Sequence, residues 1–198
     1  RISPNQITFA AMGLRLTTAI CFFTATRWGL VVGALTYLIA YVCDCTDGTV
    51  ARLKQQSTEL GRYLDHVADL VGDFLILAIL AWTQNLLFSP IVLGMLFMHI
   101  AECYISYLAG FALPEKHEPK ATNFIFDYVN KYRDWWFLQN IKSFISFPDY
   151  NAFVFVVMPM LGLPELGIKI GFYLLLVICS YTVFSTFVSI HSGRRYFP

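Results

Sequence analysis

The sequence predicts an all-α integral membrane protein with six transmembrane helices. Of its 198 residues, 57% are hydrophobic and only 14% are charged, whereas a soluble domain carries about 25% charged residues. The apolar residues gather in six stretches, close to the roughly 20 residues that a helix needs to cross the hydrocarbon core. Segments that contain proline, glycine or tryptophan separate these stretches, and all but one of these segments are short.

The expected spans cover residues 7–26, 29–51, 62–84, 88–112, 148–164 and 166–190. Pro4 stands where proline favours the first helical turn, and the polar residues Asn5 and Thr8 follow it. We expect a single transmembrane domain over residues 1–198. Because the chain begins at Arg1 rather than at methionine, it leaves room for a preceding segment.

Residues 113–147 form the one long connection between expected spans. Its second half, FIFDYVNKYRDWWFLQNIKSFISF, mixes aromatic residues with Lys, Arg and Asp. A helix at the membrane surface places aromatic rings at headgroup level and charges in water, so we expect an interfacial helix here. An aromatic belt without further function explains the same composition.

The distribution of Lys and Arg residues indicates how the chain is oriented in the membrane. If the N-terminus is cytoplasmic, 11 of the 14 Lys and Arg residues fall on the cytoplasmic side, only Arg27 and Lys169 fall on the far side, and Arg15 lies within the first span. The positive-inside rule therefore predicts that both termini and the connection after the second span are cytoplasmic. The net charge of +1 and the absence of a basic run give no reason to expect a nucleic-acid partner.

The polar stretch DCTDGTVARLKQQSTELGRYLDHVAD, residues 44–69, joins the second and third spans. Residues spaced by three or four positions share a helical face. One such face carries Asp44, Asp47, Gly48 and Ala51, and the next helix carries Gly61, Asp65 and Asp69. We expect these helices to pack antiparallel and to bring the four carboxylates together, although any one of them alone could be a solvated loop residue.

A cluster of four carboxylates predicts bound cations, because the charges repel one another strongly when no cation is present. Carboxylate oxygens without His or Cys favour Mg²⁺ or Mn²⁺, and four of them could hold two ions. Gly48, Ala51 and Gly61 leave space either for close helix packing or for a flat ligand. Arg52 offers a fork for phosphate oxygens, so the stretch indicates phosphoryl transfer.

The same stretch matches the pattern D-x-x-D-G-x-x-A-R, eight residues, then G-x-x-x-D-x-x-x-D at every defining position. In this it resembles the CDP-alcohol phosphotransferase family, whose members transfer a substituted phosphate from a CDP-linked alcohol to a second alcohol and release CMP. The resemblance implies a homodimeric membrane enzyme of phospholipid biosynthesis. CDP-diacylglycerol is the expected donor, and the acceptor alcohol is left open.

The resemblance also implies roles for individual residues. Asp44, Asp47 and Asp65 would bind the divalent metal ions, and Asp69 would share one of them and act as the catalytic base. The CDP moiety would be held by residues around these carboxylates, namely Gly48, Ala51, Arg52 and Gly61, with Asn5 and Thr8 as weaker candidates.

His66, between the third and fourth aspartates, suggests an alternative pair of substrates. An Asp-His pair is similar to the aminoalcohol branch of the family, in which a polar phosphoalcohol moves from a soluble CDP-alcohol to a diacylglycerol-like lipid. That branch has Glu-Leu-Phe before the pair, where this chain has Arg62-Tyr63-Leu64. We expect His66 to have a supporting role beside the site. A divalent-cation transporter is a more remote alternative, since internal repeats and broken helices are not evident.

Residues outside the signature would select the acceptor. Lys142, and after it Lys131 and Arg133, are candidates for binding an acceptor phosphate, although positive-inside placement also explains them. Tyr132, Trp135 and Trp136 could instead form an aromatic cage for a cationic headgroup.

Two further charges, Arg15 and Glu102, fall about 12 and 15 Å inside the expected spans. We expect them to form a buried ion pair or a polar contact to the active-site cavity. His99, one turn from Glu102, is expected to be a hydrogen-bonded core histidine.

Overall fold

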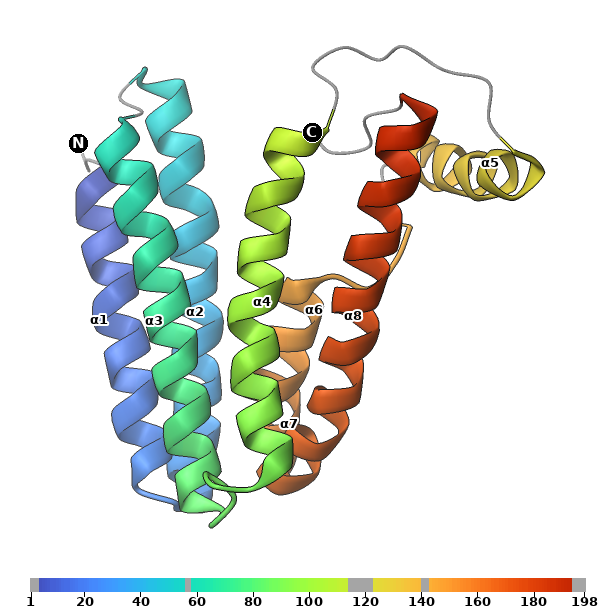
Figure 1. Ribbon diagram of the computed structural model, residues 1–198. Coiled ribbons are helices and arrows are strands. Elements are labelled where there is room, and N and C mark those ends of the chain that lie inside the picture. Colours follow the sequence, from blue (N-terminus) through green and yellow to red (C-terminus); the bar gives the residue numbers. More distant parts are fainter. Residues whose placement is uncertain (1–3, 56–57, 114–122, 140–142, 194–198) are drawn as a thin grey trace. The chain divides into compact units, whose positions relative to one another are not determined.

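The computed structural model describes the chain apart from residues 1–3, 56–57, 114–122, 140–142 and 194–198. Every regular element in the described residues is helical (Figure 1). In chain order these are α1 Pro4–Phe23, α2 Arg27–Leu53, α3 Glu59–Thr83, α4 Pro90–Ala112, α5 Phe124–Leu138, α6 Phe147–Ala152, the π-helical segment η1 Phe153–Val157, α7 Met158–Leu161 and α8 Pro164–Ser192.

Among the described helices, α1, α2, α4 and α8 are long and apolar enough to cross a membrane. Large apolar side chains such as Phe9, Ile20 and Phe97 are exposed on them, as lipid contact requires. The chain is therefore an integral membrane protein. The six expected spans end within three residues of the observed helices. Their number is not confirmed, because α3 is not among the helices that meet these criteria, and the apolar segment Phe147–Leu161 would reach only about 22 Å as a helix.

The chain divides into two compact units. The first unit contains residues 1–96 and 151–172, and the second contains residues 97–150 and 173–198. Helices α4, α6 and α8 each contribute to both units.

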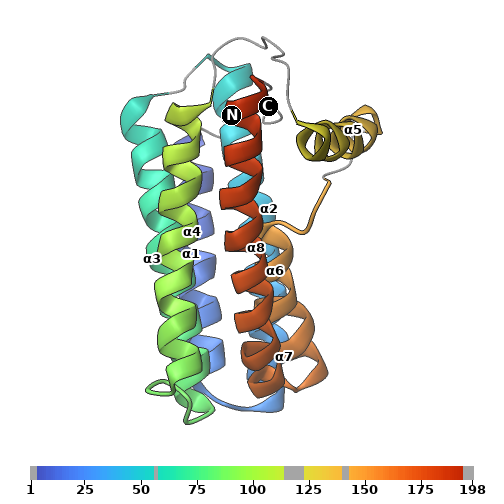
Figure 2. The same ribbon diagram turned by 45° about the vertical axis from the view of Figure 1, so that its right-hand side comes forward.

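In the first unit, α1, α2 and α3 run side by side (Figures 1 and 2). Thr26 and Thr58 start α2 and α3, where each hydroxyl accepts a hydrogen bond of 3.0 Å from a backbone N–H three residues ahead. Gly33 permits close packing, since a Cβ there would lie 2.6 Å from the ring of Phe22. The start of α1, the end of α2 and the start of α3 share one end of this bundle (Figure 1).

A buried polar network ties the middle of this unit together. The carboxylate of Asp73 on α3 accepts hydrogen bonds from the hydroxyl of Tyr37 at 2.9 Å and from the amide of Asn151 at 2.7 Å. All three side chains are buried. A buried carboxylate is tolerated only when such donors replace water, so the network fixes α2, α3 and α6 against one another.

Replacing Tyr37 with phenylalanine is expected to destabilise the protein by about 1–2 kcal/mol, because one oxygen of Asp73 loses its donor while buried. Thermal unfolding in detergent would measure the change. Tyr104→Phe, at an exposed tyrosine, is the matched control. Equal stability of both variants would show that the Tyr37 hydroxyl does not support the fold.

In the second unit, α5 lies across the direction of α8 (Figures 1 and 2). Arg133 on α5 is buried and donates to the Ser189 hydroxyl at 2.9 Å and to the Ser185 carbonyl at 3.4 Å. Glu102 on α4 accepts from the hydroxyl of Thr182 on α8 at 2.9 Å. The helix expected in residues 113–147 is thus confirmed as α5, while its place at a membrane surface stays a prediction.

Candidate active site

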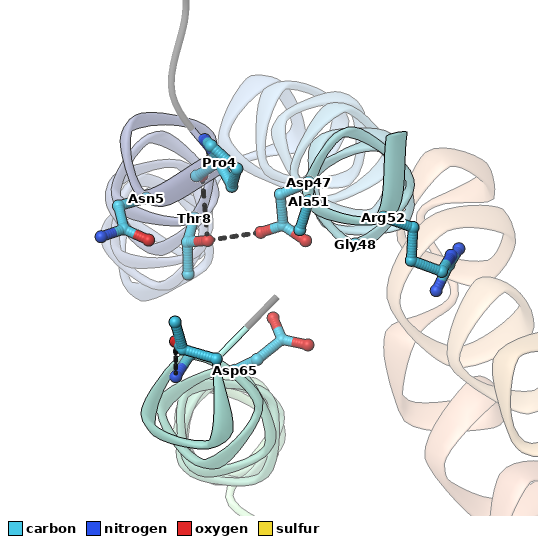
Figure 3. A pocket seen from close by; sticks show the side chains of 10 residues that line it. Pro4, Asn5, Thr8, Asp47, Gly48, Ala51, Arg52 and Asp65 are labelled. Atoms are coloured by element: carbon cyan, nitrogen blue, oxygen red, sulfur yellow. Dashed lines mark hydrogen bonds between the residues drawn. The ribbon is translucent and has the colours of Figure 1, made fainter. Parts of the chain in front are cut away.

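A cavity of about 310 Å³ opens at the end of the first unit where α1 begins and α2 ends. Side chains of α1, α2 and α3 converge on it (Figure 3). Its volume falls at the lower end of the range of ligand pockets, about 300–1,000 Å³. The cavity is lined by Pro4, Asn5, Thr8, Asp47, Gly48, Ala51, Arg52, Thr58, Gly61 and Asp65. All six residues that the sequence assigned to a nucleotide therefore line one space.

The two glycines that line the cavity, Gly48 and Gly61, have different surroundings. A Cβ at Gly48 would meet only Arg52 Nη1, at 3.7 Å, so the missing side chain widens the cavity rather than admitting another helix. At Gly61 a Cβ would lie 3.0 Å from the hydroxyl of Thr58, which caps α3 by accepting from the Gly61 N–H. Gly48 therefore does not serve close helix packing, and its role in a ligand slot stays a prediction.

Three carboxylates lie together beside this cavity. One oxygen each of Asp44, Asp47 and Asp65 lie within 4.8 Å of one another. Thr8 donates to Asp47 at 2.6 Å and so holds this buried carboxylate toward the cavity (Figure 3). Asp65 Oδ1 is buried and has no hydrogen-bond partner among the described residues. Three carboxylates, one with an unpartnered oxygen, fit a hard divalent cation.

Asp69 and Asp44 both interact with Arg15 on α1. Oδ1 of Asp69 accepts a hydrogen bond from Nη1 of Arg15, and Nη2 of Arg15 lies 3.7 Å from Asp44 Oδ1. The expected polar contact between Arg15 and the acidic site is therefore confirmed. Glu102 accepts hydrogen bonds from Ser106 and Thr182 within the second unit, and a pair between Arg15 and Glu102 stays a prediction.

Arg52 and His66 differ in their relation to the cavity. Arg52 lines the cavity but donates to the Thr49 hydroxyl at 3.3 Å, and its side chain extends away from Asp47 and Asp65 (Figure 3). His66 is exposed on α3 and does not line the cavity.

The candidates for acceptor binding belong to the second unit. Lys131 is exposed on α5, whereas the guanidinium of Arg133 is engaged by Ser185 and Ser189. Lys142 lies outside the described residues. The acceptor assignments to these three residues stay predictions. The ring of Trp136 packs edge to face with those of Trp135 and Tyr132, and a cage formed by them also stays a prediction.

The sequence interpretation missed the network of Asp73, Tyr37 and Asn151, one helical turn beyond Asp69. A signal was present for Asp73, which continues the four-residue spacing of Asp65 and Asp69. Asn151 carried no such signal, because it belongs to a different expected span and its contact crosses 78 residues of sequence.

Comparison with known proteins places the chain among membrane transferases. Residues 1–188 match the family model described as CDP-alcohol phosphatidyltransferase. The CDP-diacylglycerol–glycerol-3-phosphate 3-phosphatidyltransferase of Salmonella choleraesuis is 37% identical over 68 residues, which are 34% of this chain and 37% of that protein. The CDP-diacylglycerol–inositol 3-phosphatidyltransferase 1 of Arabidopsis thaliana is 28% identical over 110 residues, which are 54% and 46% of the two chains. The matched parts thus span less than half of either relative.

The fold has a solved counterpart. The phosphatidylinositol phosphate synthase of Mycobacterium tuberculosis, crystallised with CDP-DAG bound, superposes with a TM-score of 0.57 at 20% identity over 97% of this chain and 86% of that chain. The same protein in complex with manganese and citrate gives a TM-score of 0.56 at 19% identity, over 98% and 87% of the two chains. The two proteins share their fold.

Proposed function

This chain belongs to the CDP-alcohol phosphatidyltransferase family, and from that premise we propose that it transfers a phosphatidyl group from CDP-diacylglycerol to an acceptor alcohol, in phospholipid biosynthesis. The observation that carries the proposal is the cavity that Asn5, Thr8 and Gly48 line together with the carboxylates of Asp47 and Asp65. Both curated relatives are named for CDP-diacylglycerol as donor, and the solved counterpart was crystallised with CDP-DAG.

Within this proposal, each part of the site has one task. Gly48, Ala51 and Gly61 admit the CDP moiety, which Asn5 and Thr8 contact from α1. Asp69 accepts the proton of the acceptor hydroxyl, and the hydroxyl oxygen then forms a bond to the phosphorus that carries the diacylglycerol. The bond between this phosphorus and the bridging oxygen breaks, and the electron pair leaves with CMP.

Asp44, Asp47 and Asp65 would hold Mg²⁺ or Mn²⁺, and we propose two ions with Asp69 close to the second. When bound, such ions neutralise the diphosphate and stabilise the charge that develops on the departing CMP. The manganese complex of the solved counterpart supports a divalent cation at a site of this fold.

The distribution of Lys and Arg supports a cytoplasmic position of both termini and of the cavity. We further propose that the enzyme is a homodimer, as the family resemblance implies. Cysteine labelling from either side of a sealed vesicle would test the orientation, and light scattering of the detergent complex would test the dimer.

The decisive experiment is a screen for CMP release by the purified chain in lipid nanodiscs with Mg²⁺. CDP-diacylglycerol would be offered with glycerol 3-phosphate, inositol phosphate, inositol or serine. Release that depends on one acceptor supports the proposal and identifies the alcohol. Release from CDP-choline with diacylglycerol, but not from CDP-diacylglycerol, would contradict the donor assignment and favour the aminoalcohol alternative.

Replacing Gly48 with valine is expected to raise the KM for the CDP-linked donor by about 10-fold or more, since the new side chain would fill the slot. Unfolding should shift little, because a Cβ at this position meets only the end of Arg52. Gly110→Val is the control, as a Cβ there has no neighbour within 4 Å. An unchanged KM in Gly48→Val would exclude this part of the cavity from donor binding.

A further inference from the structure

A buried carboxylate, that of Glu102, lies within the second unit near the middle of α4, about 15 Å from the end of the helix at Ala112. Its Oε1 accepts hydrogen bonds from Ser106 at 3.2 Å and from Thr182 on α8 at 2.9 Å. Its Oε2 is buried and has no hydrogen-bond partner among the described residues. An acidic side chain inside a membrane span is costly, so the second oxygen calls for a partner.

Two neighbours of Glu102 have polar atoms in the same condition. Thr186 follows Thr182 by one turn of α8 and shares its face, and its hydroxyl is buried without a hydrogen bond. His99 precedes Glu102 by three residues and is fully buried, with its ring 4.6 Å from that of Phe147. The hydrogen bond expected for His99 is not found in the part of the chain that the structure describes. Because buried polar groups rarely stay unsatisfied, these neighbouring groups indicate an occupant.

The donors and acceptors of these groups define the occupant. Oε2 of Glu102 only accepts, a neutral imidazole needs one donor and one acceptor, and the Thr186 hydroxyl can be either. An ammonium group only donates, whereas a hydroxyl group donates and accepts and so satisfies all three. Among the described residues, Glu102 and His99 do not belong to a group close enough to hold a metal ion. The thiol of Cys179 lies beside the carboxylate, but its single hydrogen is directed to the carbonyl of Met98 at 3.7 Å.

We propose that Glu102, Thr186 and His99 form a binding site for hydroxyl groups inside the second unit. The three side chains are spread over about one turn on each helix, so the site takes more than one hydroxyl. Ordered water and a polyhydroxy acceptor alcohol both supply this chemistry. The alcohol as occupant rests on the proposed function, whereas the site itself does not.

The direct test is a crystal structure of the full chain in lipid, at a resolution that shows water, with and without inositol, one of the alcohols of the CMP-release screen. Density within hydrogen-bond distance of Glu102 Oε2 supports the site. The same density in both crystals identifies water as the occupant, and density that takes the shape of a ring only with inositol identifies the alcohol. Absence of density beside this oxygen in both crystals would overturn the proposal.

Thr186→Val removes one hydroxyl of the site at nearly constant volume. If this hydroxyl holds an occupant, the variant should unfold about 2–4 °C below the wild type in detergent. Thr186→Ser keeps the hydroxyl and should recover most of the loss. The matched control is Thr17→Val, since Thr17 is exposed and its hydroxyl bonds only to Gly13 of its own helix. An unchanged or higher unfolding temperature in Thr186→Val would refute the site, because the loss of an unpartnered buried hydroxyl carries no penalty.

Kinetics of Thr186→Val distinguish the two occupants. With the alcohol in the site, the KM for the acceptor should rise about 5-fold or more at an unchanged KM for the donor, whereas with water both KM values should stay as in the wild type. If the wild type releases no CMP, the proposed function fails. The density beside Glu102 and the unfolding temperatures need no turnover, so they then still decide on the site.

Discussion

Replacing Asp69 with asparagine is expected to lower kcat for CMP release by about 10³-fold, because an amide cannot take up the proton of the acceptor hydroxyl. The amide oxygen of asparagine still accepts the hydrogen bond from Arg15, so the fold should be kept. Mn²⁺ affinity of the site formed by Asp44, Asp47 and Asp65 should stay within about 3-fold of the wild-type value, since these three carboxylates are unchanged. Single-turnover CMP release and Mn²⁺ titration would measure the two effects.

Asp127→Asn, an exposed carboxylate in the first turn of α5, is the matched control for this exchange. It should leave turnover and Mn²⁺ binding unchanged. Full turnover of Asp69→Asn would overturn the assignment of the base. A large loss of Mn²⁺ affinity in the same variant would instead identify Asp69 as a metal ligand.

Replacing Asp65 with asparagine should weaken Mn²⁺ binding by about 100-fold, or about 2.7 kcal/mol, since the grouped carboxylates fall from three to two. CMP release should be lost at ordinary Mg²⁺ concentrations. Without metal, however, Asp65→Asn should unfold at a higher temperature than the wild type, because one of several mutually repelling charges is gone. Mg²⁺ should then stabilise the wild type and not the variant.

Differential scanning calorimetry with and without Mg²⁺ would measure both parts of this prediction. Glu165→Gln is the control, because Glu165 is an exposed carboxylate paired with Lys169 on α8 and such pairs contribute little. If Mg²⁺ stabilised Asp65→Asn as much as the wild type, Asp65 would not be a metal ligand.

Hydropathy and helical spacing predicted the helices and the cavity because both are local signals. Asp44, Asp47 and Asp65 meet as their spacing indicated, since few residues separate α2 from α3. The fifth expected span proved less regular than its composition suggested. Pro159 has no N–H to continue the helical ladder, and the π-helical segment η1 precedes it.

Contacts between distant parts of the chain could not be predicted from spacing. Arg15 contacts Asp69, which lies 54 residues later in the sequence. From the sequence, either Glu102 or the active-site cavity was an expected partner of Arg15. The positive-inside rule placed Arg133 among the expected cytoplasmic cations, yet its side chain is buried against Ser185 and Ser189 on α8. A charge in an apolar chain indicates that a partner exists, but only the packing of helices identifies the partner.

The four-residue steps from Asp65 to Asp69 to Asp73 each advance about 6 Å along α3. In the proposed mechanism, cation binding by Asp65, proton transfer to Asp69 and the buried hydrogen-bond network of Asp73 would therefore occupy successive levels of this helix. A donor held in the membrane by its acyl chains would meet an acceptor that arrives from water near Asp69, and the rise of α3 sets the position of Asp69 relative to Asp65. Inserting one residue between these aspartates would rotate them about 100° apart, so the arrangement depends on the length of this helix as well as on its sequence.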